Sequence, residues 1–377
     1  MPLDFGALRR HPDVEGPGLE AVDAADRLIL DEAAGRLAKS EPDAVAVIDD
    51  AYGALALGAA DAIGADAAHP VRAHQDLITG ERALAENAGR LGLAGAVDSL
   101  PLAPGLVAGA RLVLARLPRP LDRLDEVAAL VAGHAASGVV FVAGGRIKHM
   151  SLAMNDVLLR HFERVDVSHA RQKSRVLVAS GARTGAEPGW PRHERHGDLG
   201  LEVVAHGGVF AGAGVDIGTR FLLGELGAAM PDAPTAVDLA CGTGVVAAWL
   251  ARERPGVRVV ATDRSAAAAA SARATAEANG VGDRVEVTQA DGLERLAEAS
   301  ERLVVLNPPF HSDAALSTGI AAHLFADAAR VLAPGGELWC VWNSHLRYRP
   351  MLERTVGPTR QIARNPRFTV TASRRDG

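Results

Sequence analysis

The stretch AVDLACGTG, residues 236–244, decides the fold, because it runs from a short apolar strand directly into a glycine turn. Glycine adopts backbone conformations that other residues avoid, so Gly242 and Gly244 permit a sharp turn and the close approach of a ligand. The residues from Val245 onward predict a helix, whose first N–H groups attract an anion. The stretch therefore predicts a strand–turn–helix unit with a ligand at the turn. A tight turn that binds nothing is the structural alternative.

Strands and helices alternate along the rest of this half of the chain, which is typical of an α/β fold with a parallel sheet covered on both faces. Ligands of such sheets bind outside the carboxyl ends of the strands. Asp238, Gly242, Asp263, Asp291 and Asn307 all lie at or just past expected strand ends, so we expect them in one crevice. The expected strands are 235–239, 258–262, 284–288, 303–306 and 337–342, and the expected helices are 245–254, 266–279 and 323–332.

The amino-terminal half repeats this pattern at a nearly constant offset, which implies two Rossmann-like domains of one fold in tandem. We expect domains at residues 1–180 and 201–377, joined by a linker at 181–200 that is rich in Gly, Pro, Arg and His. The matched pairs are Asp23 with Asp216 (offset 193), Gly53 with Gly244 (191), Asn87 with Asn279 (192), Pro118 with Pro309 (191) and Arg171 with Arg364 (193).

The first copy lacks the residues that carry chemistry in the second. Where the second half has CGTG at 241–244, the first has DAYG at 50–53, with a single glycine. Where the second half has Asn307, the first has Arg116. We interpret the amino-terminal domain as a degenerate copy, retained for binding or as a scaffold.

Two acids after the glycine turn suit an adenosine-containing cofactor. Asp263 follows the expected second strand, where a carboxylate accepts hydrogen bonds from a ribose diol. NAD enzymes use the same device, but their Gly-x-Gly-x-x-Gly turn is absent, because Val245, Val246 and Ala247 follow Gly244. Asp291 is a candidate acceptor for the adenine amino group, or alternatively a solvated loop acid.

The residues Asn307, Pro308, Pro309 and Phe310 follow the apolar strand at 303–306 and are the candidate catalytic loop. The side-chain oxygen of Asn307 and the carbonyl of Pro308 can each accept an N–H from an exocyclic amine and orient its lone pair. The two prolines fix φ, and Phe310 offers a face for stacking on a flipped-out base. A rigid Pro-Pro turn that only ends a strand is the alternative. The neighbouring His311, like His345, could guide a proton or cap a loop.

Composition narrows the function classes. The formal net charge is −6, but residues 160–196 hold eight basic against four acidic residues and residues 344–377 hold eight against two, which favours a localised anionic partner. No signal peptide or membrane-spanning segment is visible, so we expect a cytoplasmic protein. The two cysteines, Cys241 and Cys340, predict packed thiols rather than a disulfide, and no cluster has metal-ligand spacing.

Taken together, the chain resembles the bacterial ribosomal RNA guanine-N2 methyltransferases, two-domain enzymes whose amino-terminal domain is a degenerate duplicate. The resemblance covers nearly the whole length and is closer to the large-subunit branch. Ala240 departs from it, since the family usually has glycine there. The motifs that carry it are GVF at 208–210, VDIGT at 215–219, residues 238–244, Asp263, residues 307–311, TGIA at 318–321, NSHLRY at 343–348, GRIKH at 145–149 and ARQKSR at 170–175.

This resemblance implies two class I methyltransferase domains, S-adenosyl-L-methionine as cofactor, and methylation of the N2 amine of a guanine in ribosomal RNA or a ribosomal subunit by a monomer without metal. It places the target guanine at Asn307, Pro308, Pro309 and Phe310. The cofactor residues it implies are Asp238, Gly242, Gly244, Asp263, Asp291 and Asn307, and the RNA-binding residues are Arg146, Lys148, Arg171, Lys173, Arg175 and Arg347.

Two alternatives stay open at this point. One is an amino-group methyltransferase that acts on a protein glutamine or a DNA adenine, although such enzymes often have Tyr where Phe310 stands. The other is a non-catalytic RNA-binding assembly factor. The second half keeps the glycine turn and Asn307 that the first half has lost, which favours an enzyme.

Overall fold

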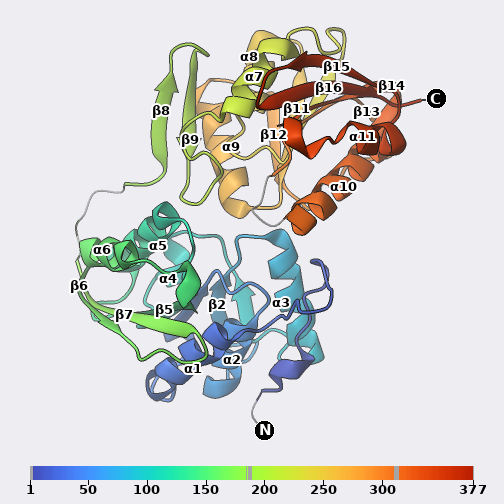
Figure 1. Cartoon of the computed structure of the whole chain (residues 1–377). Helices are drawn as coiled ribbons and strands as arrows, with labels where there is room; N and C mark the ends of the chain where they lie inside the picture. The colour runs from blue at the N-terminus through green and yellow to red at the C-terminus, as the bar shows by residue number, and fades with distance from the viewer. Residues whose placement is uncertain (1–2, 184, 186–188, 310–313, 377) are drawn as a thin grey trace. The chain divides into compact units, whose positions relative to one another are not determined.

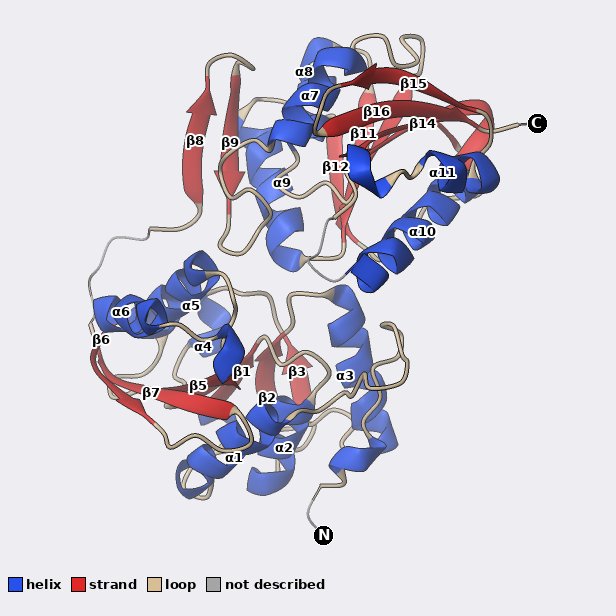
Figure 2. Cartoon of the chain, viewed as in Figure 1, coloured by secondary structure: helices blue, strands red, loops and turns tan. Residues whose placement is uncertain are grey.

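The computed structural model describes residues 3–183, 185, 189–309 and 314–376, and it places the side chains of all of these except 314–318. The chain divides into two compact units, Met1–Trp190 and Pro191–Gly377 (Figure 1). Each unit contains a seven-stranded sheet flanked by helices (Figure 2). The expected α/β class with two Rossmann-like domains is confirmed.

The first unit has the strand order β3-β2-β1-β4-β5-β7-β6. Strands β1 to β5 pair in parallel, and β7 and β6 pair antiparallel at one edge. Its strands are β1 (Val45–Ile48), β2 (Val71–His74), β3 (Val97–Ser99), β4 (Leu112–Arg116), β5 (Val140–Arg146), β6 (Phe162–Val167) and β7 (Ser174–Ala182). Its helices are η1 (Phe5–Ala7), α1 (Ala24–Leu37), η2 (Pro42–Ala44), α2 (Ala54–Ile63), α3 (Ile78–Arg90), α4 (Pro104–Val107), α5 (Leu121–His134), η3 (Ile147–His149) and α6 (Leu152–His161).

The second unit has the same topology, with the order β12-β11-β10-β13-β14-β16-β15. In this sheet β10 to β14 pair in parallel, whereas β16 runs antiparallel to β14 and β15, because a short turn rather than a crossover helix joins β15 to β16. Its strands are β8 (Arg192–His196), β9 (Leu201–Ala205), β10 (Thr235–Leu239), β11 (Arg258–Asp263), β12 (Val285–Gln289), β13 (Glu301–Leu306), β14 (Leu332–Asn343), β15 (Thr359–Arg364) and β16 (Phe368–Arg374). Its helices are α7 (Ile217–Leu226), α8 (Val245–Glu253), α9 (Ala266–Ala278), α10 (Ala314–Val331), η4 (Ser344–Leu346) and α11 (Arg349–Thr355).

Alternating apolar side chains bury both faces of the second sheet. In β13, Leu303 and Val305 pack with residues of α7 and α8, whereas Val304 and Leu306 pack with residues of α10 and α11. Successive side chains of a strand point to opposite faces, so a continuous apolar run is what a doubly covered strand requires. The polar residue that follows such a strand therefore lies at the carboxyl end of the sheet, outside both cores.

The segment 181–200, expected to be a linker, contains β8, which pairs with β9 as an antiparallel hairpin of the second unit. The hairpin is attached to α9 by polar side chains spaced four residues apart. Ser271, Thr275 and Asn279 lie on one face of the helix and its C-cap, and they accept the backbone N–H groups of residues 206, 204 and 202. The Gly, Pro, Arg and His content of residues 181–200 predicted a linker, because composition does not show that β8 pairs with β9.

Candidate functional site

The glycine turn between β10 and α8 has three left-handed residues, Ala240, Gly242 and Gly244, with φ of 55°, 54° and 73°. A Cβ on Gly244 would lie 2.8 Å from Cα of Ala272, so this glycine is required by close packing of the turn on α9. A Cβ on Gly242 would meet nothing within 4 Å. The turn is therefore packed on one side and open at Gly242, which is where a ligand can approach its backbone.

Asp238 lies beneath the turn and is buried. Its carboxylate accepts the N–H of Ala247 in the first turn of α8, at 3.0 Å. Burial raises the pKa of Asp238 to about 7, and the charge of Asp263 acts in the same direction. Asp238 thus supports the helix amino terminus from within the sheet.

Asp263 fixes the turn from the side. One carboxylate oxygen accepts the N–H of Gly242 at 3.0 Å, and the other accepts the N–H of Ser265 at 2.9 Å. These two backbone bonds hold the carboxylate in place. A half-buried acid in this position fits the diol of a ribose.

Asp291 is held near Asp263 by the backbone, because the N–H of Ala290 donates to the carbonyl of Asp263 at 2.9 Å. Its carboxylate is partly exposed and lies 3.9 Å from Nε2 of His323. The structure thus places all three acids along the carboxyl ends of β10, β11 and β12, as the sequence predicts.

Asn307 follows the last residue of β13 and is half-buried. Its Nδ2 donates to Oγ1 of Thr219 at 3.0 Å and to Oδ2 of Asp216 at 3.3 Å. Because a carboxylate only accepts, the amide nitrogen must face α7, and Oδ1 is the atom left to accept from another molecule. Pro308 is buried and Pro309 half-buried. Phe310 and His311 lie outside the described residues.

The sheet register brings these residues into one row. Leu239, the last residue of β10, pairs with Thr262 on one side and Leu306 on the other. The next residue along each strand is then Ala240, Asp263 or Asn307. The open glycine turn, the acids Asp263 and Asp291 and the amide oxygen of Asn307 therefore lie together at the carboxyl end of the sheet. This set of donors and acceptors fits an adenosine cofactor that carries a carboxylate.

The two basic motifs of the first unit meet at one end of its sheet. Arg146 pairs with Ser174 in the register of β5 and β7, and the N–H of Ile147 donates to the carbonyl of Lys173 at 2.9 Å. Lys148 and Lys173 are exposed. We call Arg146, Lys148, Arg171, Lys173 and Arg175 the basic cluster.

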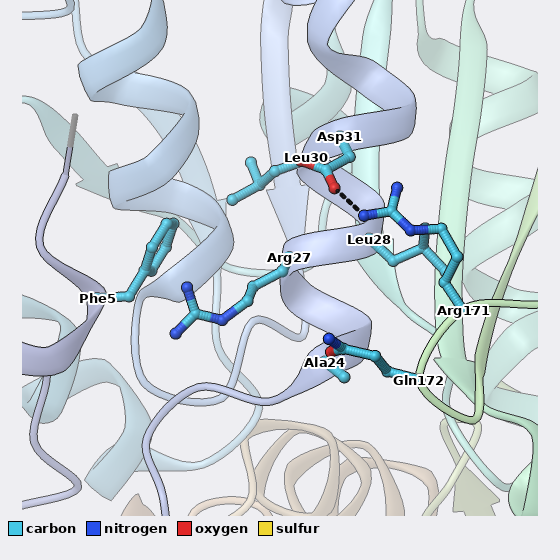
Figure 3. Close-up of a pocket in the computed structure, with 8 residues that line it drawn as sticks. All are labelled: Phe5, Ala24, Arg27, Leu28, Leu30, Asp31, Arg171 and Gln172. Carbon is cyan, nitrogen blue, oxygen red and sulfur yellow. Dashed lines mark hydrogen bonds and ion pairs between the residues drawn. The ribbon is translucent and has the colours of Figure 1, made fainter.

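Acids neutralise part of this basic cluster. Arg171 pairs with Asp31 of α1 at 2.8 Å, beside a cavity of about 220 Å³ that Phe5 and Arg27 also line (Figure 3). Arg146 lies 3.6 Å from Asp23. The two lysines are therefore the members best placed to contact an anion.

The carboxyl-terminal segment is less available than its charge suggests. Arg360 binds Glu337 through two hydrogen bonds of 2.6 and 3.0 Å, and although burial raises the pKa of Glu337, this guanidinium holds it below its usual value. Arg375 donates to the backbone carbonyls of Arg330 and Leu332. These two arginines of the tail are thus engaged within the second unit. Arg347 is exposed just past η4.

Two further expectations concern cysteines and ions. Cys241 and Cys340 are both free thiols, and burial raises the pKa of each. Within the described residues, no group of three or more His, Cys, Asp or Glu side chains could hold a metal ion. Over the same residues, no helix has the length and apolar character needed to cross a membrane.

Comparison with known proteins identifies both units. Residues 3–183 match the RLMG N-terminal domain, and residues 200–372 match the Methyltransferase small domain. The structure of the T. thermophilus 16S rRNA N2 methyltransferase RsmC, in complex with AdoMet and guanosine, has the same fold with a TM-score of 0.70. It is 23% identical, and the match covers 99% of this chain and 100% of that one. The second unit is therefore a domain of the methyltransferase class.

Curated relatives define the family. The ribosomal RNA large subunit methyltransferase G of Pseudomonas paraeruginosa is 35% identical over 366 residues, 96% of each chain. The protein of the same name from Pseudomonas putida is 34% identical over 373 residues, which cover 98% of this chain and 97% of that one. The chain belongs to the ribosomal RNA large subunit methyltransferase G family, which confirms the resemblance and the branch that the sequence favours.

Proposed function

We propose that this protein transfers a methyl group from S-adenosylmethionine to the exocyclic N2 amine of a guanine in large-subunit ribosomal RNA. The observation that carries the proposal is the fixed amide of Asn307, whose nitrogen is engaged by α7 while its oxygen is left to accept. The names of the relatives, and the guanosine in the RsmC structure, support the substrate class. We place the enzyme in the cytoplasm as a monomer.

The proposed chemistry depends mainly on orientation. S-adenosylmethionine supplies an electrophilic methyl group on a sulfonium sulfur. Oδ1 of Asn307 and the carbonyl of Pro308 each accept one N–H of the target amine, which draws its lone pair out of conjugation and fixes its direction. Pro308 and Pro309 hold φ constant, so the two acceptors keep their spacing. The N2 nitrogen would form its bond to carbon as the bond from that carbon to sulfur breaks, which leaves a neutral thioether, and the methylated nitrogen would then lose one proton to water. Positioning of this kind lowers a barrier without a strong base. Phe310 would support the flipped-out base by stacking.

The cofactor roles are divided among three places. The open backbone at Gly242 and the amino terminus of α8 beyond Gly244 receive the carboxylate. Asp263 accepts the ribose hydroxyls, and Asp291 accepts from the adenine amine. Asp238 acts indirectly, since its buried carboxylate holds the N–H of Ala247. Asn307 would lie beside the methyl group that is transferred, because it follows β13 in the same row as Asp263.

The amino-terminal unit binds the RNA. The basic cluster lies on one end of its sheet, and phosphate contacts from Lys and Arg supply most of the affinity for RNA without reading its sequence. Arg347, near the end of β14, is the corresponding contact in the catalytic unit.

The purified protein, incubated with methyl-labelled S-adenosylmethionine and large-subunit ribosomal RNA, should yield N2-methylguanosine at one position. Small-subunit RNA serves as the control and should stay unlabelled. Label on an adenine, on a protein amide or on the small-subunit RNA would contradict the assignment. Loss of the same nucleotide from ribosomal RNA of a deletion strain would locate the target.

A further inference from the structure

Asn307 is the candidate orienting residue, but an amide can act as an acceptor only if its oxygen, and not its nitrogen, faces the substrate. The two groups differ little in shape, so the choice depends on what the other end of the amide contacts. In this chain those contacts come from the start of α7. Oγ1 of Thr219 and Oδ2 of Asp216 both accept from Nδ2 of Asn307, at 3.0 and 3.3 Å.

Asp216 is itself rigidly held. It is the N-cap of α7, and its Oδ2 also accepts the N–H groups of Gly218 and Thr219 at 2.9 and 3.2 Å. Three donors thus converge on one carboxylate oxygen. A carboxylate fixed in this way rejects a flipped Asn307, because the amide oxygen would then face a negative charge. It also draws positive character to the amide N–H, which raises electron density at Oδ1.

The degenerate copy supplies an internal comparison at the same positions. Arg116 stands at the position of Asn307, and it contacts Asp23 at 2.9 Å and Asp26 at 3.3 Å. Asp23 corresponds to Asp216, and at the same offset of 193 Asp26 corresponds to Thr219. Asp23 also caps its helix, by accepting the N–H of Ala25.

The two positions have therefore changed together within one chain. The amide pairs with a hydroxyl in the second unit, and a guanidinium pairs with a carboxylate in the first, while the capping aspartate is kept in both. In both triads the formal charge is −1. In each unit the side chain that follows the strand is thus chemically matched to its partners at the start of the helix.

We infer that Asp216 and Thr219 are positioning residues of the methyl-transfer reaction, which act by locking the amide of Asn307 so that Oδ1 faces the target amine. This inference rests on the proposed function of Asn307. It assigns a reaction role to the start of α7, a segment that lies outside the glycine turn and the strand ends.

Single variants separate the two positioning groups. Thr219→Val keeps the shape of the side chain and removes the acceptor, and Thr219→Ser restores the hydroxyl. Asp216→Gly removes the carboxylate, and glycine remains an accepted N-cap residue. We expect kcat to fall about tenfold in Thr219→Val and in Asp216→Gly, as loss of one polar contact implies, with unchanged KM for RNA and unchanged affinity for adenosylhomocysteine. Thr219→Ser should retain most of the wild-type kcat.

Thr235→Val is the matched control. The hydroxyl of Thr235 is also hydrogen-bonded, to Glu301 at 2.8 Å, but it lies at the opposite end of β10 from the site. The same loss of kcat in this control would point to a general weakening of the unit and would overturn the inference. Melting temperatures of all variants are measured in parallel.

A double-mutant cycle gives the decisive result. In an Asn307→Ala background, Thr219→Val should produce no additional fall in single-turnover rate, because the group on which it acts is gone. An equal fall in both backgrounds would overturn the inference. If Asn307→Ala alone has wild-type activity, the proposed role of Asn307 fails first, so the two failures are distinguishable.

Discussion

At the end of β13 the amide of Asn307 faces a carboxylate and a hydroxyl, whereas at the end of β4 the guanidinium of Arg116 faces two carboxylates. The second arrangement is a closed ion-pair network. The guanidinium of Arg116 contains only donors, so this side chain cannot accept a hydrogen bond from an amine. The comparison shows that the same strand end can present an acceptor to a substrate or can stabilise the fold through ion pairs, depending on which side chain occupies it.

The glycine turns show the same relation in the backbone. Asp49, Ala51 and Gly53 of the first unit have φ of 57°, 59° and 99°, and they match the left-handed residues 240, 242 and 244 at an offset of 191. The carboxylate of Asp49 is bound by the buried Arg123. Gln75 occupies the position that corresponds to Asp263, because His74 pairs with the last residue of β1 as Thr262 pairs with the last residue of β10. The turn has kept its shape, whereas the neighbouring strand is followed by Gln75 in place of the acid Asp263. The polar groups of the turn now bind the protein.

The largest effect is expected when the catalytic strand end is made like the degenerate one. Asn307→Arg should pair with Asp216 and abolish methyl transfer while the unit stays folded. Asn307→Ala should lower the rate roughly a hundredfold or more, an increase in barrier of about 2–4 kcal/mol. Affinity for adenosylhomocysteine should stay nearly unchanged in the alanine variant. Transfer of labelled methyl to RNA measures the rate, and calorimetry measures the affinity for adenosylhomocysteine. A wild-type rate in Asn307→Ala would refute the assignment.

The second effect concerns the number of cofactor sites. Calorimetric titration with adenosylhomocysteine should give one site per chain, because only the second unit combines Gly242 with Asp263. Gly242→Arg should abolish binding by filling the open side of the turn. The matched change in the first unit, Ala51→Gly, should leave the stoichiometry at one. Two equivalent sites in the wild type would contradict the view that the first unit is degenerate.

A smaller effect is expected from the basic cluster. The chain has three lysines, Lys39, Lys148 and Lys173, and two of them belong to the cluster. Changing Lys148 and Lys173 to Gln should weaken RNA binding several-fold and reduce the slope of log affinity against log salt by about 1.5. Lys39→Gln is the control with the same chemistry. Equal slopes for the double variant and this control would leave the first unit as a scaffold only.

The smallest effect is on stability. Burial raises the pKa of Asp238 and of Asp50 to about 7, and both carboxylates accept N–H groups at the start of a helix. The folded state then holds protons that the unfolded state has already lost, so the free energy of unfolding should fall as pH rises from about 4 to about 7. Three of the four tryptophans, Trp249, Trp339 and Trp342, lie in the second unit. Denaturation followed by tryptophan fluorescence should therefore show a shallower fall in Asp238→Asn and little change in Asp50→Asn.

Much of the catalytic unit could be predicted because its strands are short, apolar and doubly buried. The strand expected at 235–239 is β10 without change, and the helix expected at 245–254 differs from α8 by one residue. The constant offset between the two halves predicted the tandem fold, because the packing of buried strands preserves their spacing in the sequence even after the catalytic residues have been lost. Asn87 and Asn279 illustrate this, because each binds the backbone of a segment near the start of its own unit, at Arg9 and at Glu202.

Other features could not be read from the sequence. The strands β15 and β16 are rich in arginine, and composition alone does not separate an arginine that binds RNA from one that binds Glu337. The contacts of Asn307 with Thr219 and Asp216 join residues 88 and 91 positions apart, beyond the range of any local pattern. The match of Asp23 with Asp216 in the sequence repeat points to Asp216, but it does not show that Asp216 contacts Asn307.

The left-handed turn of the first unit has a thermodynamic consequence for the second. It holds its conformation with Asp and Ala at two of the three positions, and Arg123 binds the carboxylate of Asp49, so contacts within the chain stabilise that geometry. Ordering a mobile segment costs about 1–2 kcal/mol per residue in conformational entropy. A turn that is already shaped adds no such cost to binding. A cofactor that binds at residues 240–244 would then lose little affinity to ordering of the turn, and the first unit carries the same backbone shape within the same chain.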